Sequence, residues 1–343
     1  MVVAAATIGA MNDRQPQTDE PHPENPLPTE FQALCQEGGA GERLKTLIEM
    51  ARDEDLGGDP EGGDATSAAL PDPDRRVTAD VVHRTGGPLA GLPLGPKICE
   101  AFGGRVEFST DTHDGVIAGR NAVIARLEGP IAGVLTVERT LLNFLGRLCG
   151  VAERTRAFVE RVDLGGRAFI FDTRKTTPGW RGLEKYAVRC GGGRSHRLGL
   201  HDALLIKDNH IAGVGLEELG EVVRTMAEKA REARGDSLKF VMVEVDTLGQ
   251  LQAVLKGATK AIDLVLLDNM PPPMLKEAVE LRDKLGAGVE LEASGGVTLE
   301  SVNEISKTGV ERISVGSLTH GAFWSDLGLD IRDGNDRPWD ERD

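Results

Sequence analysis

Apolar residues recur along this chain with two different patterns, and the change between them lies near Thr136. Before it, the segments Val77–His83, Gly104–Phe108 and Asn121–Leu127 alternate apolar and polar positions between glycine- and proline-containing turns. Such period-two alternation predicts short β-strands with one buried face. Near Glu42 apolar residues instead recur every three or four positions, which predicts a helix. The first half of the chain therefore predicts a small β-rich domain covered by helices.

Beyond Thr136, short apolar runs alternate with helical patterns. The helical patterns are clearest in ERTLLNFLGRLCGVAERTRAFVERV, LEELGEVVRTMAEKAREA and PPPMLKEAVELRDKL. The strand-like runs are AFIF (168–171), ALLI (203–206), FVMVEV (240–245), LVLL (264–267), VELE (289–292) and RISV (312–315). Strand–helix alternation predicts a parallel sheet, and so many units predict a β/α barrel.

Composition narrows the class of protein. Hydrophobic residues make up 40% of the chain and charged residues 28%, as is typical of soluble globular proteins. The formal net charge of −15 argues against non-specific binding of nucleic acid or anionic membranes. No apolar run approaches the roughly 18 residues of a membrane helix, and the start of the chain lacks the basic region of a signal peptide. The four scattered cysteines favour reduced thiols and a cytoplasmic location.

Two further features of the sequence are its N-terminal segment and a local group of cations in a chain that is acidic overall. Residues 1–29 are rich in proline and charge without periodicity, which predicts a disordered tail.

Although the chain is acidic overall, cations are concentrated in DTRKTTPGWRGLEKYAVRCGGGRSHRLGLHDALLIKDNH, between Asp172 and His210. A solvated face is the usual explanation for grouped charges. Here the glycines and the positions of the cations after predicted strands favour a binding site instead.

Polar residues follow every predicted strand of the barrel. Because the carboxyl ends of barrel strands meet at one mouth, where active sites lie, we expect these residues to converge. In chain order they are Thr173, Arg174 and Lys175, then Lys207, then Glu244, then Asp268, then Ser294, Gly295 and Gly296, and last Gly316 and Ser317.

These residues divide by chemical type. Arginine and lysine suit carboxylate ligands, since a guanidinium grips a carboxylate with two hydrogen bonds. Glu244 and Asp268 suit a Mg²⁺ ion that keeps several of its waters. Glycine-rich turns that open a helix, as in SGGVTLESV, suit a phosphate group. The sequence therefore predicts a small acid with several negative charges and a phosphorylated, Mg²⁺-chelating partner.

The motifs themselves resemble those of the quinolinate phosphoribosyltransferase family. DTRKTTPG, GGGRSHRLGLHDALLIKDNH, VEVDTL, LVLLDNM, EASGGV and RISVGSLTH occur in the family's order, and the resemblance extends from Glu42 to Ile331. It implies an α/β fold in which a small sandwich domain (30–135) precedes an open β/α barrel (136–318). The segment 319–343 is expected to return to the N-terminal domain, and the protein is expected to form homodimers or larger assemblies.

The resemblance also implies an activity and roles for residues. The family makes nicotinate mononucleotide, pyrophosphate and CO₂ from quinolinate and phosphoribosyl pyrophosphate, with Mg²⁺, in NAD biosynthesis. By this resemblance, Lys175, Glu244 and Asp268 are the catalytic candidates, and the two acids lie near Mg²⁺ directly or through water. Quinolinate is expected to meet Arg139 (from the neighbouring subunit), Thr173, Arg174, His196, Arg197 and Lys207. The phosphate is expected to meet Ser294, Gly295, Gly296, Gly316 and Ser317.

The sequence departs from the family pattern at two places. Asp55 is separated from Asp64 by the apparent insertion LGGDPEGG (56–63), where the family has a compact motif. Ser195 precedes the motif histidine, where bacterial members often have asparagine. Neither change removes a charged site residue. The other cations of the segment are interpreted as solvated charges outside the site; they are Arg181, Lys185, Arg189 and Arg194.

Two alternative functions remain open. One is a phosphoribosyltransferase that acts on another pyridine carboxylate, which would need fewer cations. The other is a non-catalytic relative that binds small molecules, which predicts losses among the charged positions.

Overall fold

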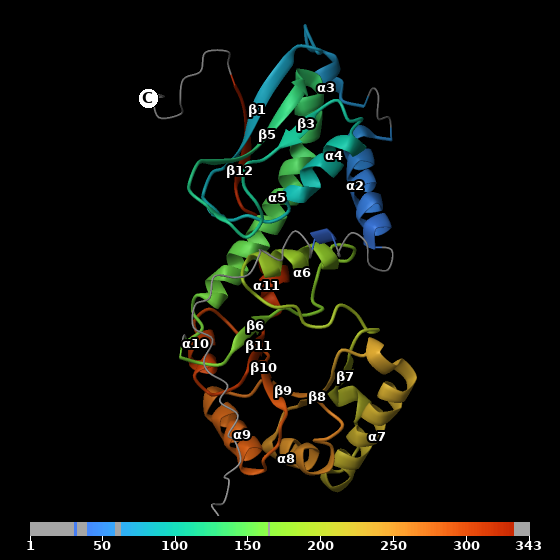
Figure 1. Ribbon diagram of the computed structural model, residues 1–343, viewed down its shortest axis with the longest axis vertical. Helices are drawn as coiled ribbons and strands as arrows, with labels where there is room; N and C mark the ends of the chain where they lie inside the picture. The colour runs from blue at the N-terminus through green and yellow to red at the C-terminus, as the bar shows by residue number, and fades with distance from the viewer. Residues whose placement is uncertain (1–30, 33–39, 59–62, 164, 333–343) are drawn as a thin grey trace, which may run out of the picture.

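The protein is elongated, with an antiparallel sheet at one end and a parallel sheet at the other (Figure 1). The computed structural model describes residues 31–32, 40–58, 63–163 and 165–332. The predicted tail over residues 1–29 lies outside these ranges, as do the insertion residues 59–62 and the C-terminal residues 333–343. None of the described helices is long and apolar enough to cross a lipid bilayer.

The N-terminal domain is built on a four-stranded sheet in the order β12-β1-β5-β3. Its strands are β1 (Arg76–His83), β3 (Glu107–Ser109), β5 (Ala122–Pro130) and β12 (Leu327–Ile331), with a small pair formed by β2 (Gly87–Pro88) and β4 (Ile117–Ala118). The helical segments beside it are α2 (Ala40–Leu56), α3 (Ala65–Ala68), η2 (Leu92–Leu94) and α4 (Gly95–Ala101). The predicted strands Val77–His83 and Asn121–Leu127 lie within β1 and, but for one residue, within β5.

The last described segment joins the first strand of this sheet. β12 runs antiparallel to β1, with Ala79 opposite Ile331 and His83 opposite Leu327. The chain therefore leaves the N-terminal domain after β5, builds the barrel and comes back to the same sheet.

The barrel domain contains six parallel strands in the order β6-β11-β10-β9-β8-β7. They are β6 (Phe169–Phe171), β7 (Leu204–Ile206), β8 (Val241–Val245), β9 (Leu264–Asp268), β10 (Glu290–Ser294) and β11 (Arg312–Ser314). The helical segments between and after them are α6 (Arg181–Cys190), η3 (Asp208–His210), α7 (Leu216–Arg234), η4 (Gly235–Ser237), α8 (Leu248–Gly257), α9 (Pro272–Lys284), α10 (Val302–Ser306) and α11 (Ser317–His320). Each of the six predicted apolar runs overlaps one strand. Because β6 and β7 are both edges of the sheet, the barrel is open between them.

A single helix, α5 (Ile131–Val159), connects the two domains (Figure 1). It begins directly after β5 and crosses the boundary expected at residue 136, so its first turns belong to a segment assigned to the small domain. The reason is local: Gly133, Val134 and Thr136 have low helix propensity, which weakens the helical pattern there. Burial stabilises these helical turns, since Ile131, Val134 and Val137 all lie in the core.

The insertion before α3 leaves its two flanking acids anchored on α5. The hydroxyl of Thr140 donates a 2.6 Å hydrogen bond to Asp55, and the hydroxyl of Thr136 donates a 2.7 Å bond to Asp64. Thr136 and Thr140 lie one helical turn apart on the same side of α5. Asp64 also caps α3 by accepting from Thr66 N and Ser67 N. Both acids that flank the insertion are therefore attached to one helix.

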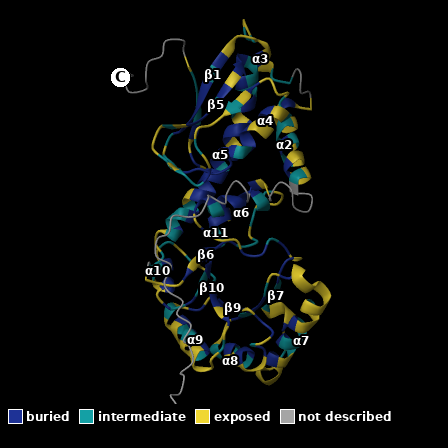
Figure 2. Cartoon of the chain, in the orientation of Figure 1, coloured by how far each residue is buried: buried dark blue, intermediate teal, exposed yellow. Residues whose placement is uncertain are grey.

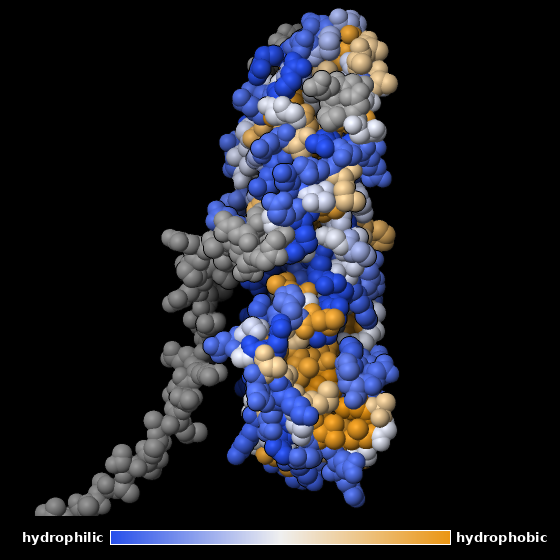
Figure 3. Space-filling view, turned by 90° about the vertical axis from the view of Figure 1, so that its right-hand side faces the viewer, coloured by the Kyte–Doolittle hydropathy of each residue, from blue (hydrophilic) through white to orange (hydrophobic). Residues whose placement is uncertain are grey.

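The barrel interior has an apolar side and a charged side. A separate apolar cluster of Leu205, Met242, Leu264 and Leu266 comes from β7, β8 and β9. On β10 and β11, Glu292 stands opposite Arg312 in the sheet register, and both Glu292 and Ser314 are buried. Figure 2 shows that the strands are mostly buried, while helices such as α7 expose their outer face. On the face shown in Figure 3, apolar surface is concentrated in the half that holds the barrel.

Candidate active site

The carboxyl ends of β7, β8 and β9 bring predicted site residues together at the mouth. Lys207 Nζ lies 2.5 Å from Glu244 Oε2, so a cation of β7 pairs with an acid of β8. Glu244 and Asp268 line one cavity of about 250 Å³, which Asp208 and Asp246 also border. The Glu244 side chain is only 13% exposed, whereas 45% of the Lys207 side chain is exposed. Lys207 is therefore the more accessible member of this pair.

The glycine-rich loops follow β10, which is next to β9 in the sheet, and β11, which is next to β10. Ser294 pairs with Asp268 in the sheet register, which places the loop after β10 beside the acid at the end of β9. Gly295 has a φ of 92°, and a Cβ there would overlap the side chain of Asn269. The position therefore requires glycine for two independent reasons. At Gly316 an added Cβ would lie 2.9 Å from Cδ of Lys175, so β6 and β11 also meet at the mouth.

The loop that contains Ser317 is held by a residue that the sequence did not single out. Arg154 of α5 donates from Nε to the Ser317 carbonyl at 2.6 Å and from Nη2 to its hydroxyl at 3.2 Å. Arg154 thus fixes a predicted phosphate loop from the connecting helix. Its sequence signal was weak, because it lies within an amphipathic helix in which surface arginines are common.

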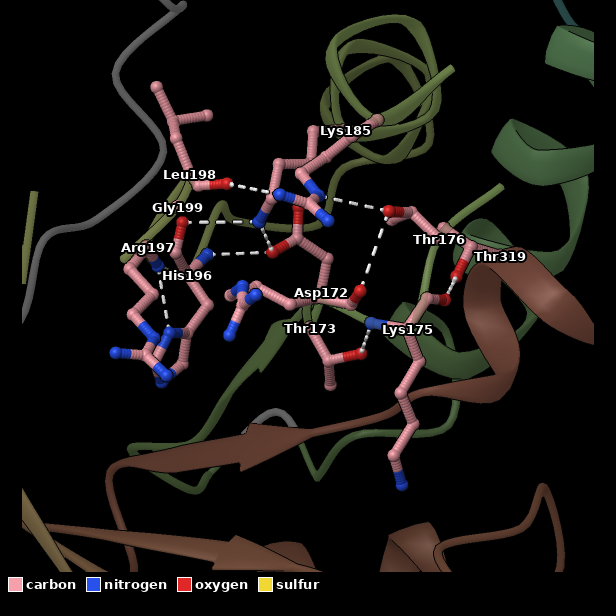
Figure 4. A network of polar contacts seen from close by, with 12 residues as sticks. Asp172, Thr173, Lys175, Thr176, Lys185, His196, Arg197, Leu198, Gly199 and Thr319 are labelled. Atoms are coloured by element: carbon pink, nitrogen blue, oxygen red, sulfur yellow. Dashed lines mark hydrogen bonds and ion pairs between the residues drawn. The ribbon is translucent and has the colours of Figure 1, made fainter. Parts of the chain in front are cut away.

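The turn after β6 holds its backbone firmly and leaves its lysine free to extend. Lys175 N donates to the Thr173 hydroxyl at 3.0 Å, and the Lys175 carbonyl accepts from the Thr319 hydroxyl at 2.6 Å. The side chain of Lys175 is exposed and extends away from the polar network (Figure 4). The Lys175 backbone is therefore fixed by hydrogen bonds, while its charged side chain is extended and exposed.

Beneath the mouth, Asp172 and Lys185 form an ion pair with side chains 0% and 2% exposed. Both partners also hold the backbone of His196: its N–H donates to Asp172 Oδ1 at 2.8 Å, and its carbonyl accepts from Lys185 Nζ at 3.2 Å (Figure 4). Burial raises the pKa of Asp172 to about 6, although the charge of Lys185 opposes this, and burial lowers the pKa of Lys185. The interpretation of Lys185 as a solvated charge is wrong, because α6 turns this side chain into the core.

The ring of His196 contacts a second buried acid. Nδ1 accepts a hydrogen bond of 2.7 Å from Arg197 N, and Nε2 lies 3.4 Å from Glu292 Oε1. The other oxygen of Glu292 accepts from Arg312 Nε at 2.7 Å. Burial raises the pKa of Glu292, but contacts with His196 and Arg312 lower it by more, so the group lies below its ordinary value. Phe240 packs against the imidazole edge with ring centroids 5.2 Å apart.

Two predicted guanidinium groups lie near one another with little negative charge between them. Arg197 is 7% exposed and donates from Nη1 to the Ala203 carbonyl at 3.1 Å. Burial, together with the positive charge of Arg174, lowers the pKa of Arg197, and Asp202 offsets only part of this. Nε of Arg174 is buried without a hydrogen-bond partner among the described residues. Such an excess of positive charge is suited to an anionic ligand.

Arg139 lies apart from all of these residues. Within the described part of this chain its ion pair is a 3.8 Å contact with Glu138, and 66% of its side chain is exposed. Arg139 and Arg154 are separated by 15 residues of α5, which corresponds to about 22 Å along the helix axis. Arg139 is therefore well separated along α5 from the residue that contacts Ser317.

Comparison with known proteins agrees with this architecture. The model of the quinolinate phosphoribosyltransferase N-terminal domain matches residues 64–149, and that of the C-terminal domain matches residues 151–330. A probable carboxylating nicotinate-nucleotide pyrophosphorylase of Bacillus subtilis is 38% identical over 84% of this chain and 93% of its own. A carboxylating nicotinate-nucleotide pyrophosphorylase of Mycobacterium leprae is 40% identical over 79% of this chain and 92% of its own.

Solved structures show the same likeness. The nicotinate-nucleotide pyrophosphorylase of Francisella tularensis superposes with a TM-score of 0.75 at 34% identity, over 85% of this chain and 96% of that one. Both family domains are thus present in the expected order, and the likeness covers most of each relative. The chain belongs to the quinolinate phosphoribosyltransferase family.

Proposed function

We propose that this enzyme transfers the phosphoribosyl group of phosphoribosyl pyrophosphate to quinolinate and releases CO₂. The products are nicotinate mononucleotide and pyrophosphate, and the reaction belongs to NAD biosynthesis, as the family indicates. The observation that carries the proposal is the division of one mouth into three parts. Cations follow β6 and β7 and lie on the segment between them, acids lie on β8 and β9, and glycine loops follow β10 and β11.

The cationic side fits the two carboxylates of quinolinate. Arg174 and Arg197 repel one another, and Lys207 is held by a single acid, so a dianion would relieve repulsion and take up unpaired donors. Lys175 extends from the β6 turn next to Gly316, between the cationic side and the glycine loops. It can therefore contact the carboxylate of one substrate and the phosphate of the other.

Glu244 is suited to the charge that develops during the transfer. As the pyridine nitrogen attacks the anomeric carbon and pyrophosphate departs, positive charge builds on the ribose. A carboxylate fixed at the mouth stabilises that charge without rearranging. Lys207 holds Glu244 when the site is empty, and quinolinate would take Lys207 from it. The resulting pyridinium accepts the electron pair released as CO₂ leaves, so this step requires no Schiff base at either lysine.

The acids of the mouth also fit Mg²⁺. Glu244 and Asp268 face one cavity, and carboxylate oxygens are the ligands that Mg²⁺ prefers. Among the described residues no three acidic, histidine or cysteine side chains cluster closely enough to enclose an ion. Glu244 and Asp268 would therefore hold Mg²⁺ together with water and substrate oxygens. When bound, the ion neutralises charge on the pyrophosphate leaving group.

An assay of the purified enzyme tests this function. Quinolinate, phosphoribosyl pyrophosphate and Mg²⁺ should together yield nicotinate mononucleotide, with one CO₂ released per nucleotide. Omission of quinolinate and addition of a chelator are the matched controls, and chelation should stop turnover while leaving the melting temperature unchanged. Product no higher than in the reaction without enzyme would reject the proposal.

The exposed position of Arg139 supports a homodimer in which this residue completes the partner's site. Mixing unfolded Arg139→Ala and Lys207→Ala chains and refolding them tests this. Each mixed dimer would contain one site with both residues, so roughly a quarter of wild-type activity should return with random pairing. If Arg139 served its own chain, every site would lack one residue and activity would stay at the level of the single variants.

A cytoplasmic location is proposed on the state of the cysteines. Cys99, Cys149 and Cys190 are buried and form no disulfide among the described residues, which fits a reducing compartment. Fractionation of cells expressing the full chain, with activity measured in each fraction, tests it.

A further inference from the structure

Glu292 is a fully buried carboxylate in the barrel interior, and the reaction described above does not use it. It lies on β10, two residues before the mouth residue Ser294, and its side chain is 0% exposed. Such a group costs free energy unless other groups compensate its charge. Its two oxygens face different partners, Arg312 and the ring of His196. The contact with the ring connects this buried acid to the predicted quinolinate site.

The contacts of His196 determine which ring nitrogen carries the proton. Arg197 N donates to Nδ1 at 2.7 Å, and since a peptide N–H can only donate, Nδ1 must be an acceptor without a proton. The proton of the ring is then on Nε2, which faces Glu292 Oε1. That oxygen lacks a hydrogen-bond partner among the described residues. The partial positive charge of the Nε2–H group therefore faces the otherwise unpartnered Oε1 and stabilises it.

The other groups around His196 contact Glu292, the ring or the His196 backbone. Arg312 donates to the far oxygen of Glu292, Phe240 packs against the ring at a steep angle, and the hydrogen bonds that Asp172 and Lys185 make with His196 involve its backbone. The backbone is thus fixed by one buried pair and the ring by another group. A doubly protonated ring would turn an N–H of Nδ1 against the N–H of Arg197.

We propose that Glu292 is a positioning residue that holds His196 with its proton on Nε2 and thereby fixes Arg197 for quinolinate. In this arrangement His196 serves the site as a neutral acceptor that orients the Arg197 peptide. The positive charge offered to the second carboxylate then comes from Arg174, Arg197 and Lys207. The inference rests on the proposed function and assigns a task to a residue that does not contact the substrate.

The first test measures the ring itself and needs no variant. Protein labelled with ¹⁵N-histidine should show for His196, at about pH 7, one protonated nitrogen and one unprotonated nitrogen that is Nδ1. The loss of this signal in His196→Asn identifies it. A ring protonated on both nitrogens, or on Nδ1 alone, would overturn the proposal whether or not the enzyme turns over.

The second test is the pair Glu292→Gln and Glu290→Gln. Glutamine at 292 must turn its oxygen to Arg312 Nε, which leaves its NH₂ group facing Nε2 and favours the wrong tautomer. We expect the KM for quinolinate to rise about tenfold, with the KM for phosphoribosyl pyrophosphate unchanged. Glu290 is the matched control, because it lies on the same strand and its carboxylate is 3.9 Å from Arg312 Nη1. The carboxylate beside the His196 ring, in contrast, belongs to Glu292. Equal effects of the two changes on the quinolinate KM would overturn the proposal.

A double-variant cycle tests whether Glu292 acts through His196. The asparagine side chain of the His196→Asn variant keeps an acceptor near the Nδ1 position and lacks Nε2, so Glu292→Gln should add little further effect in that background. Full additivity would mean that Glu292 acts by another route. If Glu292→Gln does not fold, the wild-type ring measurement decides alone. A wild-type enzyme that forms no product would reject the proposed function, and quinolinate binding by calorimetry would then replace KM.

Discussion

The charges at the barrel mouth and those beneath it are held in different ways. At the mouth, Lys175 is exposed, and Lys207 makes one ion pair with nearly half of its side chain in solvent. Beneath it, Asp172 and Lys185 are fully enclosed, and each makes a further hydrogen bond to His196. The buried charges have fixed partners within the chain, whereas the mouth charges have few.

Under the proposed function, the difference separates charges that fix the site from charges that meet the ligands. A buried ion pair is costly to break, because the remaining charge loses its compensation without gaining water. An exposed pair contributes little to stability and can change partner at small cost. Stability and activity should therefore respond to different substitutions in these two regions, although both belong to the same end of the barrel.

The largest expected effect comes from removing a buried partner. Lys185→Met should lower the free energy of unfolding by about 3–5 kcal/mol, since Asp172 is left as an uncompensated buried charge. Lys207→Met is the control at the mouth, and its loss should stay below about 1 kcal/mol. Urea denaturation of both variants measures this difference. Equal losses would remove the distinction between the two regions.

Acids at the mouth should affect chemistry and leave folding intact. Glu244→Gln and Asp268→Asn should each lower kcat about a hundredfold, as expected for the loss of one preorganised charge. Their melting temperatures should remain within about 2 °C of wild type. Steady-state kinetics and thermal unfolding of the same samples check both parts. A large fall in melting temperature would place these acids with the buried charges.

The mouth should also distinguish between ligands of different charge. Nicotinate lacks one carboxylate of quinolinate, and each cation left unpaired in the partly closed site would cost about 1–3 kcal/mol. We therefore expect kcat/KM for nicotinate to be lower by roughly tenfold to a hundredfold. Competition between the two acids for one enzyme sample measures this ratio. Similar values would show that the cations do not recognise the second carboxylate.

The smallest expected effect comes from a change of geometry at constant charge. Arg174→Lys should lower kcat/KM for quinolinate by about tenfold, because a fork with two donors becomes a point charge. Arg181→Lys is the control; Arg181 donates to the Thr176 hydroxyl and the Leu198 carbonyl and lies outside the predicted site. Turnover of Arg174→Lys close to wild type would show that only net charge matters at this position.

Sequence patterns predicted the framework well because the parallel strands are buried on both faces. Runs such as LVLL and FVMVEV are largely apolar, and β9 and β8 lie within one residue of them. The convergence of Lys207, Glu244 and Asp268 also followed from the rule that strand ends meet at one mouth. The roles of these residues in binding and catalysis stay predictions.

The buried charges could not be predicted in the same way. Lys185 lies on a strongly amphipathic helix, and its burial depends on the ion pair with Asp172, which follows β6. Glu292 alternates with Glu290 along β10, a pattern that fits an exposed strand face as well as a charged barrel interior. In both cases the decisive partner, Asp172 or Arg312, is absent from the local pattern. Only the folded chain brings these pairs together.

The pairing of β12 with β1 has a consequence for synthesis on the ribosome. Val81 emerges some 250 residues before its partner Leu329, so translation at about 5–20 residues per second leaves this edge open for tens of seconds at the slower rates. During that time β1 presents unpaired N–H and C=O groups, a template for unwanted association. The small domain emerges first and is completed last. A nascent chain stopped after α11 should hold a complete barrel beside a sheet that still binds chaperones.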